Sequence, residues 1–509
     1  MPNQNRNSYF RLPHIFVAAF CISTPAHAQI AVERDDLSDK DRARVQEIVK
    51  PTTDFSKAEN FEVKQGGAGT SIKKVNRDAF SHFSTNITFK EEETFKLGNA
   101  LFRKLWVSSP SSTQASDGLG PLFNARACQS CHIKDGRGHP PEGDTDATSM
   151  FLRLAKSPTT KLEEQELKDF VRTTFPDPTY GGQLQDLAVP GLDGEGQMKI
   201  TYENIIENFA DGETITLRKP SYEAINLNYG PLDPHTTLSP RVTPQMIGLG
   251  LLEAIHESDI VNNADPDDQN NDGISGKYQI IGDGNGNRIL ARFGWKAEMP
   301  TIRQQSAGAF AGDIGISTPD KPNNHGDCTD AQTQCLAMPH GEQARLGVGE
   351  APDEVLSLVT FYSQNLAVPA RRNAEDMDVL TGKKHFYDLG CASCHRPKYV
   401  TSRNAENKAH QFQLIWPYTD LLLHDMGEGL ADGQQVGIAN GREWRTPPLW
   451  GIGLTKTVND HTFFLHDGRA RNLTEAIVWH GGEAETAKNK FLELDKSARD
   501  NLIKFLASL

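Results

Sequence analysis

Two copies of one short motif contain four of the seven cysteines of this 509-residue chain. They are CQSCH, at 128–132, and CASCH, at 391–395. In this spacing both thiols can bond to the vinyl groups of a haem, and the adjacent histidine can ligate its iron. The motifs therefore predict two covalently bound haem c groups. The attaching residues are Cys128, Cys131 and Cys391, Cys394, and the iron ligands are His132 and His395.

Two other chemistries use paired cysteines. A redox dithiol would lie at a strand-to-helix junction and needs no histidine after it. A zinc site would have to join two pairs that are 263 residues apart. A motif repeated with its histidine favours haem over both.

The N-terminal residues are typical of an export signal. Arg6 and Arg11 precede the apolar run 15–22, and Ala26 and Ala28 are small residues at the positions that determine cleavage. Eight or so apolar residues cannot span about 30 Å of hydrocarbon, which argues against an uncleaved anchor. We predict cleavage after Ala28 and a periplasmic protein. In an oxidising compartment Cys328 and Cys335, in CTDAQTQC, should form a disulfide, although two buried free thiols are the alternative.

The charge balance excludes some partners. Removal of residues 1–28, which hold two arginines and no acid, changes the formal net charge from −14 to −16. Binding to nucleic-acid phosphates needs clustered Lys and Arg, so we expect no nucleic-acid partner. The chain is 37% hydrophobic and lacks long apolar runs, so we also expect no membrane span.

Helical periodicity precedes each motif. Before the second, Leu380, Lys383, Phe386 and Tyr387 recur at helical spacing, and Gly390 ends the pattern. Before the first, the pattern consists of Phe95, Leu97, Gly98, Leu101, Phe102 and Leu105, but the polar insertion 108–120 separates it from Cys128. The two copies form an imperfect internal repeat.

The segment between the motifs is rich in Pro and Gly and has short β-like runs at 214–217 and 278–281. We expect a mainly α fold with an α+β insertion, in which two cytochrome c-like haem domains are joined by an irregular middle region. The expected boundaries are a signal peptide at 1–28, a charged extension at 29–85 that wraps the surface, haem domains at 86–180 and 371–509, and the middle region at 181–370.

The middle region contains DPDDQNNDGISG. Its Asp268, Asn270, Asp272 and Gly273 match the first half of a calcium loop, in which alternating oxygens converge on the ion. The closing Glu is missing because Gln279 occupies its position. Calcium binding and a plain surface turn both remain open.

The order of these and neighbouring motifs resembles the di-haem oxidoreductase family over most of the mature chain. It is similar, more distantly, to bacterial di-haem cytochrome c peroxidases and methylamine-utilisation di-haem enzymes. The motifs that carry the resemblance are CQSCHIKDGRGHPP, GLGLLEAI, RFGWKAEMPTIRQQSAGAF, FYSQNLAVPARR, CASCHRP, PYTDLLLHDMGEGLADG, EWRTPPLWGIG and FLHDGRARNLTEAIVWHGGEA.

The resemblance implies a sixth ligand for the second haem. In the peroxidases that ligand, usually Met, follows a T-P-x-L segment and an F-x-H-D-G segment. Thr446, Pro447 and Leu449 match the first segment; Phe464, His466, Asp467 and Gly468 match the second. The corresponding position here is His480, which would give a bis-His haem of lower potential. Met426 and His424 are alternatives, and His480 could instead cap a helix next to Gly481.

For the first haem the resemblance identifies no sixth ligand. His139, His235 and His256 are candidates, each more typical of an ordinary polar residue. Within RFGWKAEMPTIRQQSAGAF we expect Trp295 to pack between the haems or relay electrons, although a core aromatic is equally consistent. Gln305 is the expected polar residue of the distal pocket, and Arg303 and Gln304 beside it are expected to line the same pocket.

These features imply an exported di-haem c-type cytochrome with peroxidase-like activity. Its expected partners are a small redox protein or small-molecule electron donor, and peroxide or another small oxidant. The alternative is a non-catalytic periplasmic electron-transfer cytochrome associated with iron uptake.

Overall fold

The computed structural model describes residues 30–142 and 148–509. The predicted export signal, and with it Arg6, Arg11 and the cleavage site at Ala28, lies outside the described residues. In the described part of the chain, no helix combines the length and the apolar character needed to cross a bilayer.

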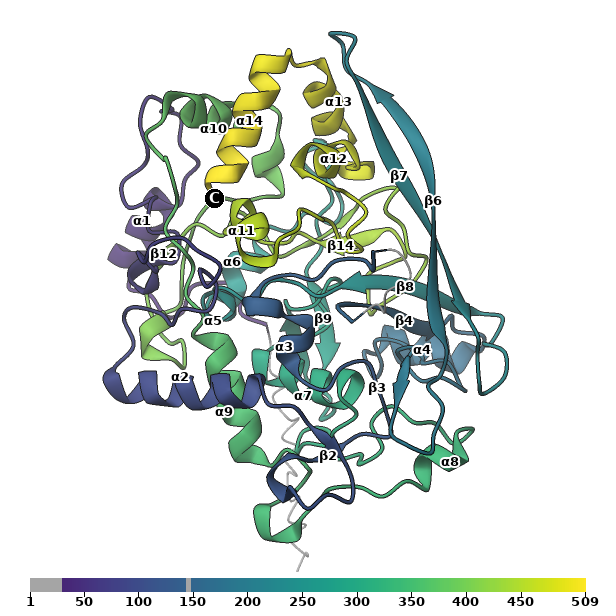
Figure 1. Ribbon diagram of the computed structural model, residues 1–509. Helices are drawn as coiled ribbons and strands as arrows, with labels where there is room; N and C mark the ends of the chain where they lie inside the picture. The colour runs from purple at the N-terminus through teal and green to yellow at the C-terminus, as the bar shows by residue number, and fades with distance from the viewer. Residues whose placement is uncertain (1–29, 143–147) are drawn as a thin grey trace, which may run out of the picture.

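The longer helices form two groups at opposite ends of the molecule (Figure 1). In the first group, α2 (Phe89–Phe102) packs on α9 (Asp353–Gln364), which also contacts α7 (Ile302–Asp313). In the second group, α10 (Met377–Asp388) packs on α14 (Lys496–Ser508), near α12 (Leu473–Val478) and α13 (Glu485–Glu493). Each group adjoins one of the two cysteine motifs.

The described residues form seven sheets, and each sheet has only two strands. The longest is the hairpin of β6 (Gln197–Asn208) and β7 (Thr214–Ile225), which runs along one side of the molecule (Figure 1). Strand β4 (Met150–Lys156) pairs with β8 (Thr236–Val242), and β9 (Gln279–Gly282) pairs with β10 (Arg288–Ala291). Strand β13 (Leu423–Asp425) pairs with β14 (Glu443–Arg445) and borders the second motif's cavity.

The remaining α-helices and strands lie outside these groups and sheets. The helices are α1 (Asp39–Ile48), α3 (Cys128–Cys131), α4 (Lys161–Lys168), α5 (Leu249–Glu253), α6 (Glu257–Val261), α8 (Thr333–Leu336) and α11 (Thr455–Asn459). The strands are β1 (Val107–Ser108), β2 (Asp117–Leu119), β3 (Leu122–Phe123), β5 (Leu187–Ala188), β11 (Tyr399–Val400) and β12 (Leu414–Ile415).

Local sequence explains how the helices before the motifs begin and pack. The side chain of Thr88 accepts a hydrogen bond from the backbone N–H of Glu91, and the side chain of Glu91 accepts one from the backbone N–H of Thr88. The two bonds form a capping box at the start of α2. Gly382 lets α10 approach α14, because a Cβ there would overlap the carbonyl of Asn501. Gly390 has a φ of +93° and turns the chain directly into Cys391.

The helix predicted before the second motif is confirmed, since α10 spans Leu380 to Tyr387. The helix predicted before the first motif is confirmed as α2 but ends at Phe102, so Leu105 lies outside it. Leu97 is exposed and does not belong to the buried face of α2. Both β-like runs of the middle region fall in strands, β7 and β9, although β9 starts at Gln279.

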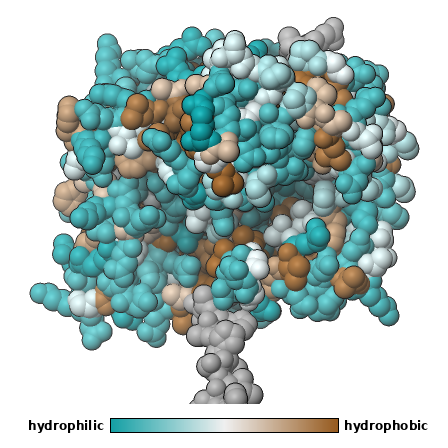
Figure 2. Space-filling model, turned by 90° about the horizontal axis from the view of Figure 1, so that it is seen from below, coloured by the Kyte–Doolittle hydropathy of each residue, from teal (hydrophilic) through white to brown (hydrophobic). Residues whose placement is uncertain are grey.

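The expectation of a mainly α fold is only partly right, because the molecule is mixed α/β with small sheets. The charged extension 29–85 does more than cover the surface, because Glu62 and Phe80 within it are fully buried. Seen from below the view of Figure 1, the surface is mainly hydrophilic, with apolar residues in separate small groups (Figure 2). The domain boundaries remain predictions.

Candidate functional site

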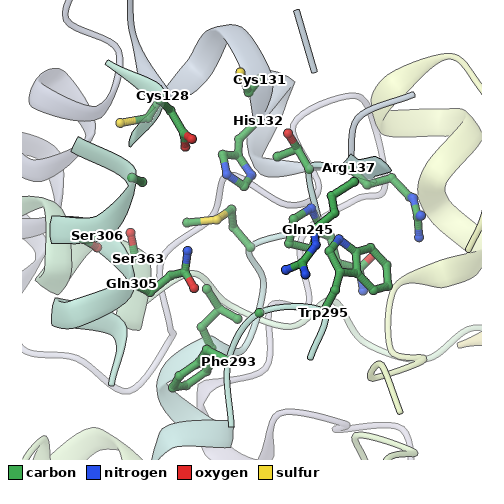
Figure 3. A pocket seen from close by; sticks show the side chains of 18 of the residues that line it. Cys128, Cys131, His132, Arg137, Gln245, Phe293, Trp295, Gln305, Ser306 and Ser363 are labelled. Atoms are coloured by element: carbon green, nitrogen blue, oxygen red, sulfur yellow. The ribbon is translucent and has the colours of Figure 1, made fainter. Parts of the chain in front are cut away.

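The first motif opens into a large cavity. Helix α3 carries Cys128 and Cys131, neither of which is in a disulfide, and His132 follows directly. The cavity encloses about 1700 Å³ including its mouth, and all three residues line it. Figure 3 shows His132 projecting into this space from the side of the cysteines. Phe102 at the end of α2 supports the imidazole, with ring centroids 5.9 Å apart.

The second motif lines a cavity of about 1800 Å³, mouth included. Its lining includes Cys391, Cys394 and His395, and neither cysteine is in a disulfide. The Nδ1 of His395 donates to the carbonyl of Tyr418 at 3.0 Å. This bond orients the imidazole and leaves Nε2 free to ligate a metal, the usual arrangement of a metal-binding histidine.

His480, the predicted sixth ligand, lines the same cavity as His395. Its Nδ1 donates to the carbonyl of Ala476 at 2.7 Å, so its Nε2 is free as well. Met426 also lines this cavity. The third candidate, His424, has both ring nitrogens engaged: Nε2 lies 2.8 Å from Asp420 and Nδ1 lies 2.7 Å from Glu483. The geometry therefore favours His480 or Met426 over His424.

His466, from the F-x-H-D-G segment, is a further histidine of the second cavity. It is 4% exposed, its ring stacks on Trp444 at a centroid distance of 3.8 Å, and its Nε2 has no hydrogen-bond partner. Burial lowers its pKa to about 4, which keeps the ring neutral.

The two cavities share one wall. Six residues line both cavities: Arg137, Trp295, Arg445, Pro447, Leu449 and Ile452. Trp295 is 7% exposed and held in place by its indole N–H, which donates to the carbonyl of Val242 at 2.9 Å. The predicted inter-haem tryptophan therefore stands between the two motif cavities, while it is also part of the core.

The predicted polar cluster on α7 is divided by the helix. Gln305 lines the first cavity and projects into it from α7 (Figure 3). Gln304 is exposed, and Arg303 forms surface ion pairs with Asp320 at 2.8 Å and Asp353 at 2.7 Å. Successive residues of a helix point about 100° apart, so three neighbours cannot face one cavity. The expectation that Arg303 and Gln304 join Gln305 is wrong.

The three histidines considered for the first haem lie outside its cavity. His139 contacts His461 and Phe463, and His235 is exposed. His256 caps α6 and bonds Asp35 at 3.0 Å. Among the described residues that line the first cavity, His132 is the only histidine, whereas four histidines line the second.

Two partly buried carboxylic acids of the first cavity were missed by the sequence analysis. Burial raises the pKa of Asp313, whose carboxylate accepts from Gln183 at 3.0 Å. Burial would also raise the pKa of Glu298, but Arg241 at 2.5 Å lowers it below the ordinary value. Asp313 is eight residues after Gln305 on α7, so helical periodicity could have placed both on one face.

The predicted disulfide between Cys328 and Cys335 is present. In the predicted calcium loop, side-chain oxygens accept from backbone N–H groups within the loop. Asp268 accepts from Asp272 at 2.9 Å and from Gly273 at 3.2 Å, and Asn270 accepts from Asp272 at 2.8 Å. These bonds are those of an ordinary surface turn, and calcium binding stays a prediction.

Both cavities suit haem c chemically. Each is lined by two cysteines that are not in a disulfide and by the histidine that follows them, and the rest of each lining is largely apolar. The free Nε2 of His395 is the atom that an axial ligand needs.

Comparisons with known proteins agree with this chemistry. The model of the family described as "Di-haem oxidoreductase, putative peroxidase" matches residues 60–509. A search of curated proteins finds no match. Among solved structures, a chain from the hydrazine synthase of Kuenenia stuttgartiensis, pressurised with xenon, is 12% identical. The match covers 87% of this chain and 97% of that chain, with a TM-score of 0.32, which is too low to support an argument.

Proposed function

The chain belongs to the di-haem oxidoreductase family, and from that premise we propose that it is an exported c-type cytochrome that reduces peroxide. One haem is bound through Cys128, Cys131 and His132, and the other through Cys391, Cys394 and His395. A haem held at the first motif would supply a place for the small oxidant, and a haem held at the second would supply electrons that come from a small redox protein or small-molecule donor.

The observation that carries this proposal is the unequal number of histidines in the two cavities. His132 is the only histidine among the described lining residues of the first cavity, so a haem held there would find no second imidazole in this lining. In the second cavity His395 and His480 both present a free Nε2. A haem at the first motif would therefore be suited to taking up a small oxidant, and a haem at the second motif would be suited to electron transfer.

When bound, haem supplies one-electron redox chemistry at each site and, where an axial position is open, a place for a small oxidant. The protein must supply orientation and protons, because reduction of a peroxide to two waters consumes two electrons and two protons. Gln305 can hydrogen-bond the oxidant through its amide, which donates and accepts but does not titrate. Asp313, with its raised pKa, is the better source of a proton in the same cavity.

Trp295 is the proposed path between the two haems. It touches both cavities, and its backbone carbonyl accepts the N–H of Arg445 at 2.9 Å, which ties it to β14. An aromatic side chain held in this way keeps a constant distance to either site. Replacing it with a smaller ring would slow electron passage without altering the axial ligands.

Electron paramagnetic resonance of the oxidised protein tests the assignment. We expect one high-spin and one low-spin haem. Two low-spin haems would favour the alternative of a non-catalytic electron-transfer cytochrome.

Oxidation of the reduced protein by hydrogen peroxide tests the activity. Gln305→Leu should slow it about tenfold or more, as loss of a positioned hydrogen-bond donor does in other enzymes. Trp295→Phe should slow re-reduction of the first haem. Gln304→Leu is the matched control, because Gln304 is on the same helix but faces solvent. Peroxide oxidation no faster than that of an ordinary six-coordinate cytochrome c would refute the proposal.

A further inference from the structure

Two arginines in the shared wall carry charges that no carboxylate neutralises. Arg137 and Arg445 both line both cavities. In the described part of the chain, neither forms an ion pair within 4.0 Å, whereas Arg241 in the wall of the first cavity pairs with Glu298 at 2.5 Å. Arg445 is buried and Arg137 is partly buried, and a charge withdrawn from water without a counter-charge is unfavourable, so this pair of cations needs an explanation.

Arg137 follows the first motif by five residues and reaches into the wall. Its Nη2 donates to the carbonyl of Leu465 at 2.6 Å, and its Nε has no hydrogen-bond partner among the described residues. The guanidinium lies 5.8 Å from the ring centroid of Trp295. Burial lowers its pKa to about 10, which leaves it charged at neutral pH.

Arg445 ends β14, and its backbone N–H donates to the carbonyl of Trp295 at 2.9 Å. Its Nε donates to the carbonyl of Gly294 at 2.9 Å, and its Nη1 donates to the carbonyl of Thr446 at 3.0 Å. Burial lowers the pKa of Arg445 to about 10 as well. Carbonyls orient both guanidinium groups but do not balance their charge, and both residues line the cavities.

The nearest carboxylates are already committed to other partners. Asp467, near Arg137, bonds Arg469 and the hydroxyl of Tyr222, each at 2.8 Å. Of the two acids near Arg445, Glu298 pairs with Arg241 at 2.5 Å, and Asp420 bonds His424 at 2.8 Å. Both arginines are therefore left for an anion that enters the cavities.

We infer that Arg137 and Arg445 bind the carboxylate side chains of the two haems, so that the carboxylate-bearing edges of both haems meet at the shared wall beside Trp295. The inference rests on the proposed attachment of haem at both motifs. Thioether bonds fix one edge of each haem at its cysteines, and the carboxylate groups are the remaining charged groups of the molecule. Arginine suits them because its planar guanidinium can bind a carboxylate with two parallel hydrogen bonds.

This arrangement has an electrostatic consequence. A cation near the iron favours the ferrous state, because the ferric state carries one more positive charge. Since both arginines touch both cavities, removing either should lower the potentials of both haems. A residue that served only one haem would shift only one potential.

The test compares Arg137→Gln and Arg445→Gln with Arg292→Gln in the haem-loaded protein. Arg292 is a matched control, since it is buried and donates to three backbone carbonyls but lines neither cavity. Haem content by pyridine haemochrome comes first, followed by spectroelectrochemical potentials and the resonance Raman bands of the haem carboxylates. Arg137→Lys and Arg445→Lys keep the charge, and they provide the measurement if a glutamine variant does not fold.

We expect two haems per chain in every variant. In each glutamine variant of the wall, the ferrous/ferric equilibrium of both haems should shift about tenfold toward ferric, which is 59 mV for a one-electron couple. The carboxylate bands should change, and the lysine variants should retain most of the potential. Unchanged potentials and bands in a protein with two haems would overturn this inference alone. Absence of covalent haem from the unmodified protein would instead overturn the proposed function.

Discussion

Substitution of the buried Glu62 tests whether the N-terminal extension supports the second haem. Glu62 is fully buried and pairs with Arg371, and its Oε2 lies 2.9 Å from Nζ of Lys383. It also accepts from the hydroxyl of Tyr418 at 3.2 Å. The backbone carbonyl of Tyr418 accepts the hydrogen bond from Nδ1 of His395. Tyr418 therefore connects Glu62 to the proposed iron ligand.

Glu62→Gln should lower the free energy of unfolding by roughly 3 to 5 kcal/mol, the usual cost of removing one partner of a buried ion pair. We expect a value near the lower end. Lys383 keeps Glu59 at 2.9 Å, so Arg371 is the cation left without a carboxylate within the described residues.

Urea unfolding of the haem-loaded protein, followed by tryptophan fluorescence and by haem absorbance, measures the effect. Asp388→Asn is the control, because it breaks an exposed Lys384–Asp388 pair on α10 and should cost no more than about 0.5 kcal/mol. If Glu62→Gln and Asp388→Asn destabilise the protein equally, the extension is a surface cover and the reasoning fails.

The effect should also depend on pH. Burial alone would raise the pKa of Glu62, but Arg371 and Lys383 lower it below the ordinary value of 4.5. A carboxylate with a depressed folded-state pKa stabilises the protein fully above the unfolded value, and this contribution is lost as the pH falls through the folded value. The difference between wild type and Glu62→Gln should therefore be constant above about pH 5 and shrink below pH 4.5.

Three further predictions concern the proposed haem attachment sites and the packing of α10. Acid-acetone treatment of the denatured protein should leave two haems on the chain, and replacing Cys391 together with Cys394 by alanine should leave one; complete extraction would rule out thioether attachment. His480→Met should raise the potential of one haem, because a thioether ligand favours ferrous iron; an unchanged spectrum and potential would transfer the ligand role to Met426. Gly382→Ala should lower the melting temperature, because its Cβ would overlap the α14 backbone where α10 crosses it; wild-type stability would show that the helices can separate at little cost.

Local patterns predicted the helices well where one face of the helix is buried. The spacing of Leu380, Phe386 and their neighbours identified α10, and Gly390 marked its end. The same reasoning extended the earlier helix too far. Leu105 is exposed beyond the end of α2, because an apolar residue at helical spacing does not have to be part of the helix.

The sequence identified site residues that belong to a short motif better than residues whose role depends on distant parts of the chain. Gln305 lines the first cavity, and its distal role stays a prediction; its neighbours Arg303 and Gln304 do not line that cavity, because the helix turns them toward solvent. Arg137 and Arg445 were not recognised at all. Nothing in their immediate sequence indicates that each would line both cavities without a carboxylate partner within the described residues.

By itself, the sequence determined that the chain has two haem attachment motifs, because attachment needs only two cysteines and a histidine within five consecutive residues. It also indicated the resemblance that the family match over residues 60–509 confirms. Only the tertiary structure decided that the two cavities adjoin, that Trp295 stands between them, and that the second has several histidines while the first has one. These properties depend on segments that lie hundreds of residues apart in the chain, and long-range packing rather than any local pattern brings such segments together.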